Sequence, residues 1–315
     1  MQFFKTPNID FVSRRKVAYM ISGILLVVGI ASLIIHGGPN YGIDFKGGTS
    51  IALKIEQKTS VGELRQYLAD EGFENAEIKS FGPKDEFLIY IEQQRGASAN
   101  EVAQEVIGII AMGLGVDLTA PDSGIQELMV DTVGPRIGSE LRKATLIAAG
   151  VALFLILLYI GWRFELVFSM GAILALFHDV MITLGIFSLL NIEISLKEFA
   201  AFLTIIGYSL NDTIVVYDRI RENLKVLRSE DLSTIMNRSI NQCLSRTIVT
   251  SLTTFIVVLI LYLFGGEVIK GFAFAMLVGV VVGTYSSIFV ASPVVLEWQN
   301  RHGGKGELKM AKKKK

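Results

Sequence analysis

Asp212 lies inside an apolar stretch that is long enough to cross a bilayer, FAAFLTIIGYSLNDTIVVYDRIR at residues 199–221. An ionisable side chain in such a stretch costs roughly 3 to 17 kcal/mol, so a carboxylate placed there is a candidate for binding or moving an ion. Asn211 lies beside it and would either support the carboxylate or hold two helices together. Asp212 is therefore our first candidate for proton chemistry.

Arg246 is the candidate cationic partner of Asp212. It precedes a further apolar stretch at 248–264, so the two side chains would meet if the two stretches form neighbouring helices. A guanidinium beside a carboxylate changes how tightly the carboxylate holds a proton, so movement of Arg246 would switch the proton affinity. Thr250 and Thr254 share its helix face by i, i+4 and i+8 spacing, where they would order water or only pack as small residues.

Asp179 and His178 form a second polar pair inside an apolar stretch, at 166–190. By the same argument of cost, Asp179 is a candidate for proton conduction. His178 is a candidate relay because imidazole changes its charge near neutral pH, although a hydrogen-bonded interior histidine would look the same in the sequence. Neighbouring residues point from a helix in different directions, so the spacing does not make this pair act together. No third metal-type ligand accompanies them, and we expect no metal site.

These residues require helices that cross a membrane. The 315-residue chain is 51% hydrophobic and has a mean hydropathy of +0.50. Several of its apolar runs are long enough to span a bilayer as helices. The sequence therefore predicts an α-helical membrane protein with six transmembrane helices, at 17–35, 144–160, 166–190, 199–216, 248–264 and 268–295.

Lys and Arg are concentrated on one side of these predicted helices. Because positively charged loops stay in the cytoplasm, we expect both termini to be cytoplasmic and the segment 37–138 to be extracytoplasmic. Residues 1–36 then hold the N-terminal tail and an uncleaved first helix, and 139–297 hold the other five helices. Basic and spaced apolar residues at 218–246 predict an amphipathic helix on the cytoplasmic surface. The basic tail at 298–315 would attract anionic lipid.

The extracytoplasmic segment is predicted to be a small α+β domain. Alternating apolar residues predict strands, and two Ser-x-x-Glu capping boxes predict helices that begin after Ser60 and Ser98. The order βαββαβ is typical of a ferredoxin-like fold, with its elements at 49–57, 60–71, 76–81, 86–93, 98–114 and 125–133.

A glycine-rich motif, YGIDFKGGTS at 41–50, opens this domain directly after the first membrane helix. Asp44 stands among its glycines, and the pair Gly47-Gly48 permits turns that other residues cannot adopt. We take Asp44, Gly47 and Gly48 as a candidate extracytoplasmic motif.

Several classes of function are excluded by missing motifs. The sequence has no Walker loop, HExxH, paired CxxC or GxSxG. We therefore expect no ATP hydrolysis or other enzymatic activity, no cofactor besides a coupling ion, and no nucleic-acid partner. The single cysteine, Cys243, excludes an internal disulfide.

Four motifs stand out when the whole chain is considered. They are Gly42-Ile43-Asp44 with Gly47-Gly48; Phe177-His178-Asp179; the run GYSLNDTIVVYDR at 207–219; and Arg246-Thr247 followed by Thr250-Ser251 and Thr253-Thr254. Together they resemble the SecF family, the smaller partner in the SecD/SecF protein-export complex. The run at 207–219 is long and highly specific, and the resemblance covers nearly the whole chain.

The resemblance implies half of a proton-driven transporter of the resistance-nodulation-division type in the bacterial inner membrane, with SecD as the other half. It also implies that the proton motive force draws preproteins outward after the SecA ATPase and the SecYEG channel have begun translocation. Asp212 and Arg246 match the positions that the family assigns to proton conduction, and Asp179 matches another motif aspartate. The sequence leaves open whether sodium replaces the proton.

Two other functions fit the same residues. An exporter of small hydrophobic molecules or lipids would share the transmembrane plan, but one βαββαβ unit is too small to enclose a substrate funnel unaided. A scaffold without an ion cycle would hold SecD on the channel, and the charges of Asp179, Asp212 and Arg246 argue against it.

Overall fold

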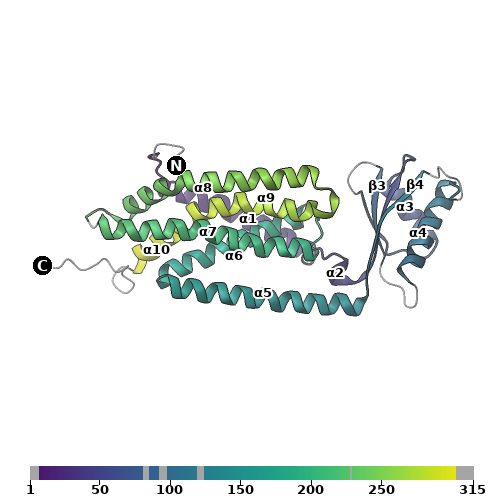
Figure 1. Cartoon of the computed structure of the whole chain (residues 1–315), viewed down its shortest axis with the longest axis horizontal. Helices are drawn as coiled ribbons and strands as arrows, with labels where there is room; N and C mark the ends of the chain where they lie inside the picture. Colours follow the sequence, from purple (N-terminus) through teal and green to yellow (C-terminus); the bar gives the residue numbers. More distant parts are fainter. Residues whose placement is uncertain (1–6, 81–84, 92–97, 119–123, 228, 303–315) are drawn as a thin grey trace. The chain divides into compact units, whose positions relative to one another are not determined.

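The computed structural model describes residues 7–80, 85–91, 98–118, 124–227 and 229–302. The chain divides into two compact units. The first comprises residues 1–40 and 148–315 and is helical, and the second comprises residues 41–147 and contains a sheet (Figure 1). The sequence places the soluble domain at 37–138, so the second unit also includes the beginning of the following long helix.

Long apolar helices dominate the first unit. Six stretches of the described chain are long and apolar enough to cross a membrane, which confirms the predicted membrane class. The helices are α1 (Arg15–Ile35), α5 (Pro135–Arg163), α6 (Leu166–Leu189), α7 (Leu196–Val226), α8 (Leu232–Phe264) and α9 (Glu267–Ser286), the last continued by a π-helical turn (Ser287–Ala291) and α10 (Ser292–His302).

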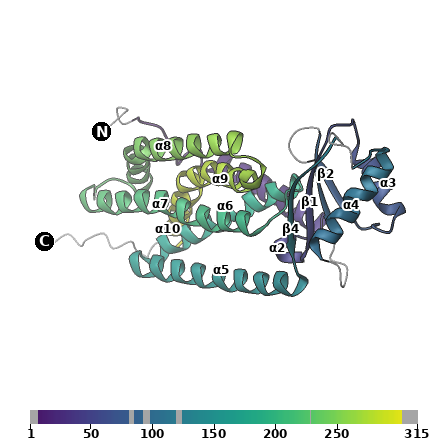
Figure 2. The same cartoon turned by 45° about the vertical axis from the view of Figure 1, so that its right-hand side comes forward.

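Small residues allow some of these helices to pack closely. α1 lies against α6, and α7 lies against both α8 and α9, as the two views show (Figure 2). A Cβ atom on Gly29 would lie 2.9 Å from the Cα of Gly185, and a Cβ on Gly279 would lie 2.2 Å from the Cγ1 of Ile205. Gly29 thus lies at the contact of α1 with α6, and the GxxxG pattern at Gly279 and Gly283 lies at the contact of α9 with α7, whereas a Cβ on Gly23 would meet nothing within 4 Å.

The connection at 218–246 differs from the prediction. It does not form a separate amphipathic helix, because α7 continues to Val226 and α8 already begins at Leu232, where the Asp231 side chain accepts a hydrogen bond from the Thr234 N–H. The spaced apolar residues of this stretch belong to the buried core of the first unit instead of a membrane-facing stripe, among them Ile220, Leu224, Ile235, Met236 and Ile240.

The last predicted helix is interrupted by the π-helical turn at Ser287–Ala291. Pro293 follows it, and proline lacks the N–H that would continue the α-helical ladder. Such turns often occur at functional sites. Side chains satisfy the carbonyl groups that the wider turn exposes: the Tyr217 hydroxyl donates to the Ala291 carbonyl at 3.0 Å, and Ser292 Oγ donates to the Ser287 carbonyl at 3.1 Å.

The second unit is a four-stranded antiparallel sheet with strand order β2-β3-β1-β4. The predicted alternation of strands and helices is observed, and both capping boxes are present. The predicted strand ends at 81 and 92–93 lie outside the described residues. The elements are α2 (Ile43–Lys46), β1 (Gly48–Ile55), α3 (Val61–Asp70), β2 (Glu77–Ser80), β3 (Glu86–Ile91), α4 (Ala99–Leu114) and β4 (Ile125–Val133).

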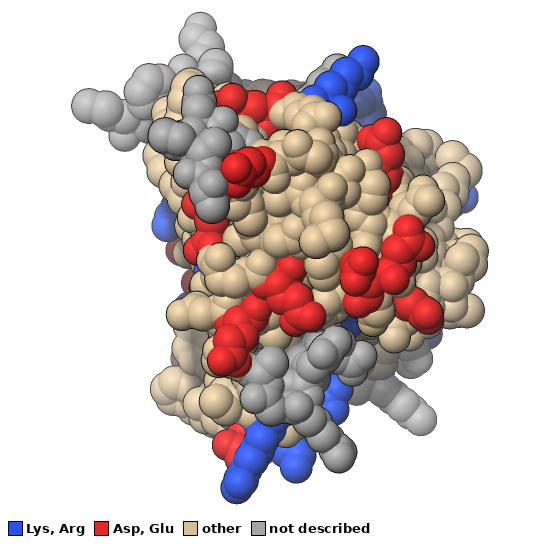
Figure 3. All heavy atoms as spheres, turned by 90° about the vertical axis from the view of Figure 1, so that its right-hand side faces the viewer, with Lys and Arg blue, Asp and Glu red and all other residues tan. Residues whose placement is uncertain are grey.

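One core holds this unit together. Ile51, Leu53 and Ile89 of the sheet are fully buried with Leu64 of α3 and Ile110 of α4. The outer surface of the two helices carries exposed carboxylates, and the face shown in Figure 3 is accordingly rich in Asp and Glu.

Candidate functional site

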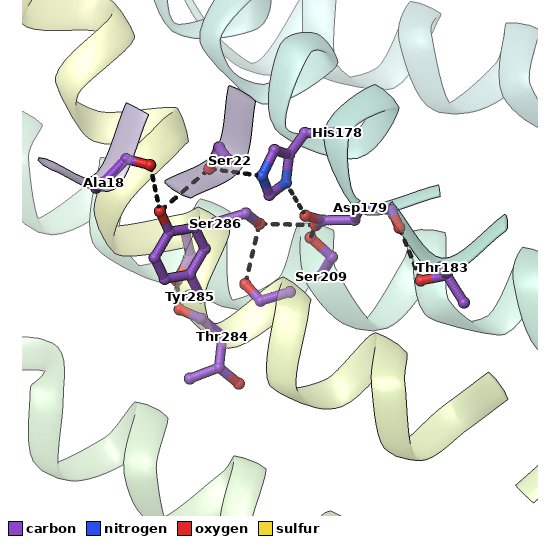
Figure 4. A network of polar contacts seen from close by, with 11 residues as sticks. Ala18, Ser22, His178, Asp179, Thr183, Ser209, Thr284, Tyr285 and Ser286 are labelled. Carbon is purple, nitrogen blue, oxygen red and sulfur yellow. Dashed lines mark hydrogen bonds and ion pairs between the residues drawn. The ribbon is translucent and has the colours of Figure 1, made fainter. Parts of the chain in front are cut away.

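Asp179 is the centre of a buried polar network in the first unit (Figure 4). Only 1% of this α6 residue is exposed. Its Oδ2 accepts hydrogen bonds from Ser209 Oγ of α7 at 2.5 Å and from Ser286 Oγ of α9 at 2.7 Å, and its Oδ1 lies 2.8 Å from His178 Nδ1. Both oxygens are therefore satisfied, as a buried carboxylate requires.

His178 extends this network to the first helix. Its Nε2 lies 2.9 Å from Ser22 Oγ of α1, and Ser22 Oγ lies 3.1 Å from the hydroxyl of Tyr285. Tyr285 in turn donates to the Ala18 carbonyl at 2.8 Å. If Nδ1 donates to Asp179, Nε2 is the acceptor for Ser22.

The structure brings His178 and Asp179 into contact, a point that their spacing in the sequence left open. Their Cβ atoms diverge on the helix, but the imidazole ring is long enough to reach back to the neighbouring carboxylate. Sequence reasoning also missed four hydroxyl residues of the network, because one hydroxyl in an apolar helix is not a distinctive signal; they are Ser22, Ser209, Tyr285 and Ser286.

Asp212 lies on α7, one turn beyond Ser209, and is only 3% exposed. In the described part of the chain, its carboxylate has one hydrogen-bond partner, Ser251 Oγ of α8, at 3.4 Å. Ser251 Oγ in turn lies 2.7 Å from Thr284 Oγ1 of α9. Asp212 is thus buried but held far less firmly than Asp179.

Arg246 does not make the direct contact that the sequence suggests. Its side chain is exposed, and none of the ion pairs among the described residues joins it to Asp212. The predicted packing of the two helices is correct. However, the α8 residue that contacts Asp212 is Ser251.

The other predicted supporting residues also lie away from Asp212. Asn211 is exposed. Thr250 and Thr254 are half-buried, and the Thr250 hydroxyl donates to the carbonyl groups of Arg246 and Thr247 on its own helix, both at 3.0 Å. The row of threonines therefore does not line a path to Asp212 in this conformation.

A pocket of about 340 Å³ lies between α8 and α9, next to the Asp212 site. Its polar wall consists of Ser251 and Thr284, the two hydroxyl residues that lead to Asp212. The remaining lining is apolar: Ile248, Leu252, Phe255, Val280 and Val281. The described residues contain no group of three His, Cys, Asp or Glu side chains that could hold a metal ion.

The backbone conformation explains why positions 47 and 48 of the motif are glycines. Gly48 has a φ of +132°, and a Cβ atom there would lie 2.6 Å from the Ile91 carbonyl oxygen. Gly47 has a φ of +77°, and its carbonyl accepts a hydrogen bond from the Tyr90 hydroxyl. Asp44 lies in the single turn of α2 just before them. Both glycines are therefore needed where the chain enters the sheet.

Known proteins match this chain along nearly its whole length. Residues 116–301 match the family model described as protein export membrane protein SecD/SecF, C-terminal, and residues 32–59 match the SecD/SecF GG motif. The protein translocase subunit SecF of Rhodothermus marinus is 42% identical over 99% of this chain and 100% of that protein. SecF of Desulfurispirillum indicum is 46% identical over 96% of this chain and 94% of that protein.

A solved structure shows the same fold. The crystal structure of SecDF from Thermus thermophilus, described as a translocon-associated membrane protein, is similar with a TM-score of 0.84 and 40% sequence identity. The match covers 95% of this chain and 40% of the SecDF chain, so this chain corresponds to less than half of that protein.

Proposed function

Because this chain belongs to the SecF family of protein translocase subunits, we propose that it works with SecD in using the proton motive force. The pair would promote late translocation and release of preproteins that emerge from the SecYEG channel. SecD is inferred from the relatives and from the length of the SecDF chain, of which this chain covers 40%. SecYEG, SecA and the preprotein are partners that the family resemblance implies.

The observation that carries this proposal is the difference between the two buried carboxylates. Asp179 accepts hydrogen bonds on both oxygens. Asp212 has one long contact, to Ser251, within the described residues. A carboxylate that is buried but weakly bonded can gain and lose a proton with little rearrangement of its neighbours, and this is the property a proton carrier needs.

Each charged residue then has a role. Asp212 binds and releases the coupling proton, and the charge of Arg246 biases that equilibrium. Asp179, with His178, forms the second proton-holding group, whose network joins α1, α6, α7 and α9. Sodium in place of the proton remains the alternative coupling ion, and the proposal includes neither a cofactor nor an enzymatic step.

The proposed topology has both termini in the cytoplasm of a bacterial cell and residues 37–138 outside the inner membrane. The distribution of Lys and Arg supports it. The strand order β2-β3-β1-β4, with one helix between β1 and β2 and another between β3 and β4, supports a ferredoxin-like domain. That domain would contact the emerging chain.

The test is the gradient-dependent release of a precursor from membrane vesicles that contain this chain and SecD. Asp212→Asn keeps the size of the side chain but cannot exchange a proton. We expect it to lose the gradient-dependent part of release and still copurify with SecD. Asp231→Asn is the matched control, because it makes the same chemical change at an exposed helix cap where Asn is nearly as good as Asp. Normal gradient-dependent release by Asp212→Asn would contradict the proposal and favour a scaffold without an ion cycle.

A further inference from the structure

Thr247 differs from several threonines of the membrane helices in how its hydroxyl is bonded. A threonine in a helix can donate its hydroxyl to the carbonyl one turn earlier. Several residues of the helices described above do so, with donor–acceptor distances between 2.6 and 3.0 Å: Thr183, Thr204, Thr250, Thr253 and Thr284. Thr247 is only 1% exposed, and its Oγ1 has no hydrogen-bond partner among the described residues.

Two contacts on the same face of α8 show where Thr247 points. Ser251, one turn later, contacts Asp212, and Cys243, one turn earlier, has its Sγ 3.7 Å from the Val215 carbonyl oxygen. Residues four apart lie above one another on a helix. Thr247 therefore faces α7 next to the Asp212 site, one turn nearer the connection between α7 and α8.

Four buried side-chain oxygens in the described chain lack a partner: those of Tyr19, Tyr208, Thr247 and Gln299. Of these, Thr247 lies one turn from Ser251, the α8 residue that contacts Asp212. A buried hydroxyl without a hydrogen-bond partner costs free energy. Its position beside a weakly bonded carboxylate therefore indicates that a polar ligand binds there. Water is the ligand of the right size and chemistry, since it needs two to four polar partners, and Ser251, whose Oγ contacts Asp212, lies one turn away on the same face of α8.

We propose that Thr247 is a positioning residue for proton exchange at Asp212, with its hydroxyl binding a water molecule between α7 and α8. When Asp212 loses its proton, this water accepts it and passes a proton on towards the connection between the two helices. The Thr247 hydroxyl holds the water and is unchanged at the end of the step. This inference rests on the proposed role of Asp212. It adds a residue that assists proton exchange on the side of Asp212 that is nearer the connection between α7 and α8.

The test compares two substitutions in vesicles that contain the full chain with SecD. Thr247→Val replaces the hydroxyl by a methyl group of similar size, whereas Thr247→Ser keeps the hydroxyl. We expect Thr247→Val to slow gradient-dependent precursor release by about fivefold or more, the effect of one lost hydrogen bond, and Thr247→Ser to restore it. Thr204→Val is the control, because that exposed hydroxyl is already paired with the Ala200 carbonyl.

Thermal unfolding of the same complexes separates this role from a structural one. Because the Thr247 hydroxyl bonds no protein group among the described residues, Thr247→Val should keep the wild-type melting temperature or a higher one. Release at the wild-type rate, loss of release by Thr247→Ser as well, or a lower melting temperature would each overturn the proposal. Asp212→Asn is measured in the same vesicles. If precursor release by Asp212→Asn still depends on the gradient, the proposed function itself fails. If Asp212→Asn loses gradient-dependent release but Thr247→Val does not, only the proposed role of Thr247 fails.

Discussion

Two aspartates buried in the same helical unit have opposite surroundings. Asp179 accepts hydrogen bonds from residues of two other helices and pairs with His178. Asp212 has a single long contact with Ser251 in the described chain. Charge in an apolar helix marks both as functional candidates, but only the number of their partners distinguishes a firmly held group from an exchangeable one.

Ser286→Ala tests how firmly Asp179 is held. The substitution removes one of the two hydroxyl donors to Asp179 Oδ2 and leaves the bond from Ser209, and one hydrogen bond contributes about 0.5 to 1.5 kcal/mol to stability. We expect the free energy of unfolding of the purified complex in detergent to fall by that amount. Ser139→Ala is the control, since Ser139 is exposed on α5. Equal stability of the two variants would contradict a structural role for the Asp179 network.

The sequence identifies the charged residues of the site but not their partners. Asp179, Asp212 and His178 stand out because polar groups are costly in apolar helices. Ser22 contacts His178 across 156 positions of the chain, and Ser286 contacts Asp179 across 107. Helical spacing shows which residues share a face but not which helix that face meets, and this is why the sequence did not identify Ser251 as the α8 residue in contact with Asp212.

At the scale of helices and strands, apolar runs predict where the membrane helices lie but not where they end. α7 and α8 continue beyond their apolar cores because residues such as Ile220 and Ile240 are buried between helices. The π-helical turn before Pro293 was not predicted either, because a proline near the end of a helix also fits an ordinary terminus. In the second unit, local signals suffice: both capping boxes and the alternation of strands and helices are observed.

Gly29→Ala tests the packing of α1 on α6. The new methyl group would lie 2.9 Å from the Cα of Gly185, so one backbone must shift. We expect a loss of about 1 to 3 kcal/mol in unfolding free energy, the range typical of overpacking. Gly23→Ala on the same helix meets nothing within 4 Å and should be neutral or slightly stabilising. The packing argument fails if both variants unfold alike in a denaturant titration.

The capping box of α3 predicts a dependence on pH. The Ser60 backbone N–H and then its hydroxyl donate to Glu63, which lowers the pKa of Glu63 below its ordinary value of 4.5. Because the folded-state pKa is depressed, this stabilisation is present above the ordinary value and is lost as the pH falls through the folded-state pKa. Glu63→Gln should remove that dependence, since Gln can still cap.

Amide hydrogen exchange in the first turn of α3, corrected for the intrinsic rate at each pH, measures this effect. The wild-type turn should lose protection on acidification, and the Glu63→Gln turn should not. Parallel loss in both would show that the capping carboxylate is not the responsible group.

At the scale of the whole molecule, the chain is a membrane protein of the SecF family with one helical unit and one sheet unit. The polar side chains of Asn211 and Arg246 are exposed although they lie on helices apolar enough to cross a membrane. Polar groups on such helices usually face other protein or water instead of lipid. Their exposure therefore supports SecD as the second half of the proposed ion pathway.

The central claim is that Asp212 takes up and releases the coupling proton, and infrared difference spectroscopy of the reconstituted complex with SecD tests it most directly. Spectra recorded as the pH is raised should contain a band from a protonated carboxyl group that disappears. Our account predicts that this band is lost in Asp212→Asn and kept in Asp231→Asn. A band of unchanged intensity in Asp212→Asn would contradict it.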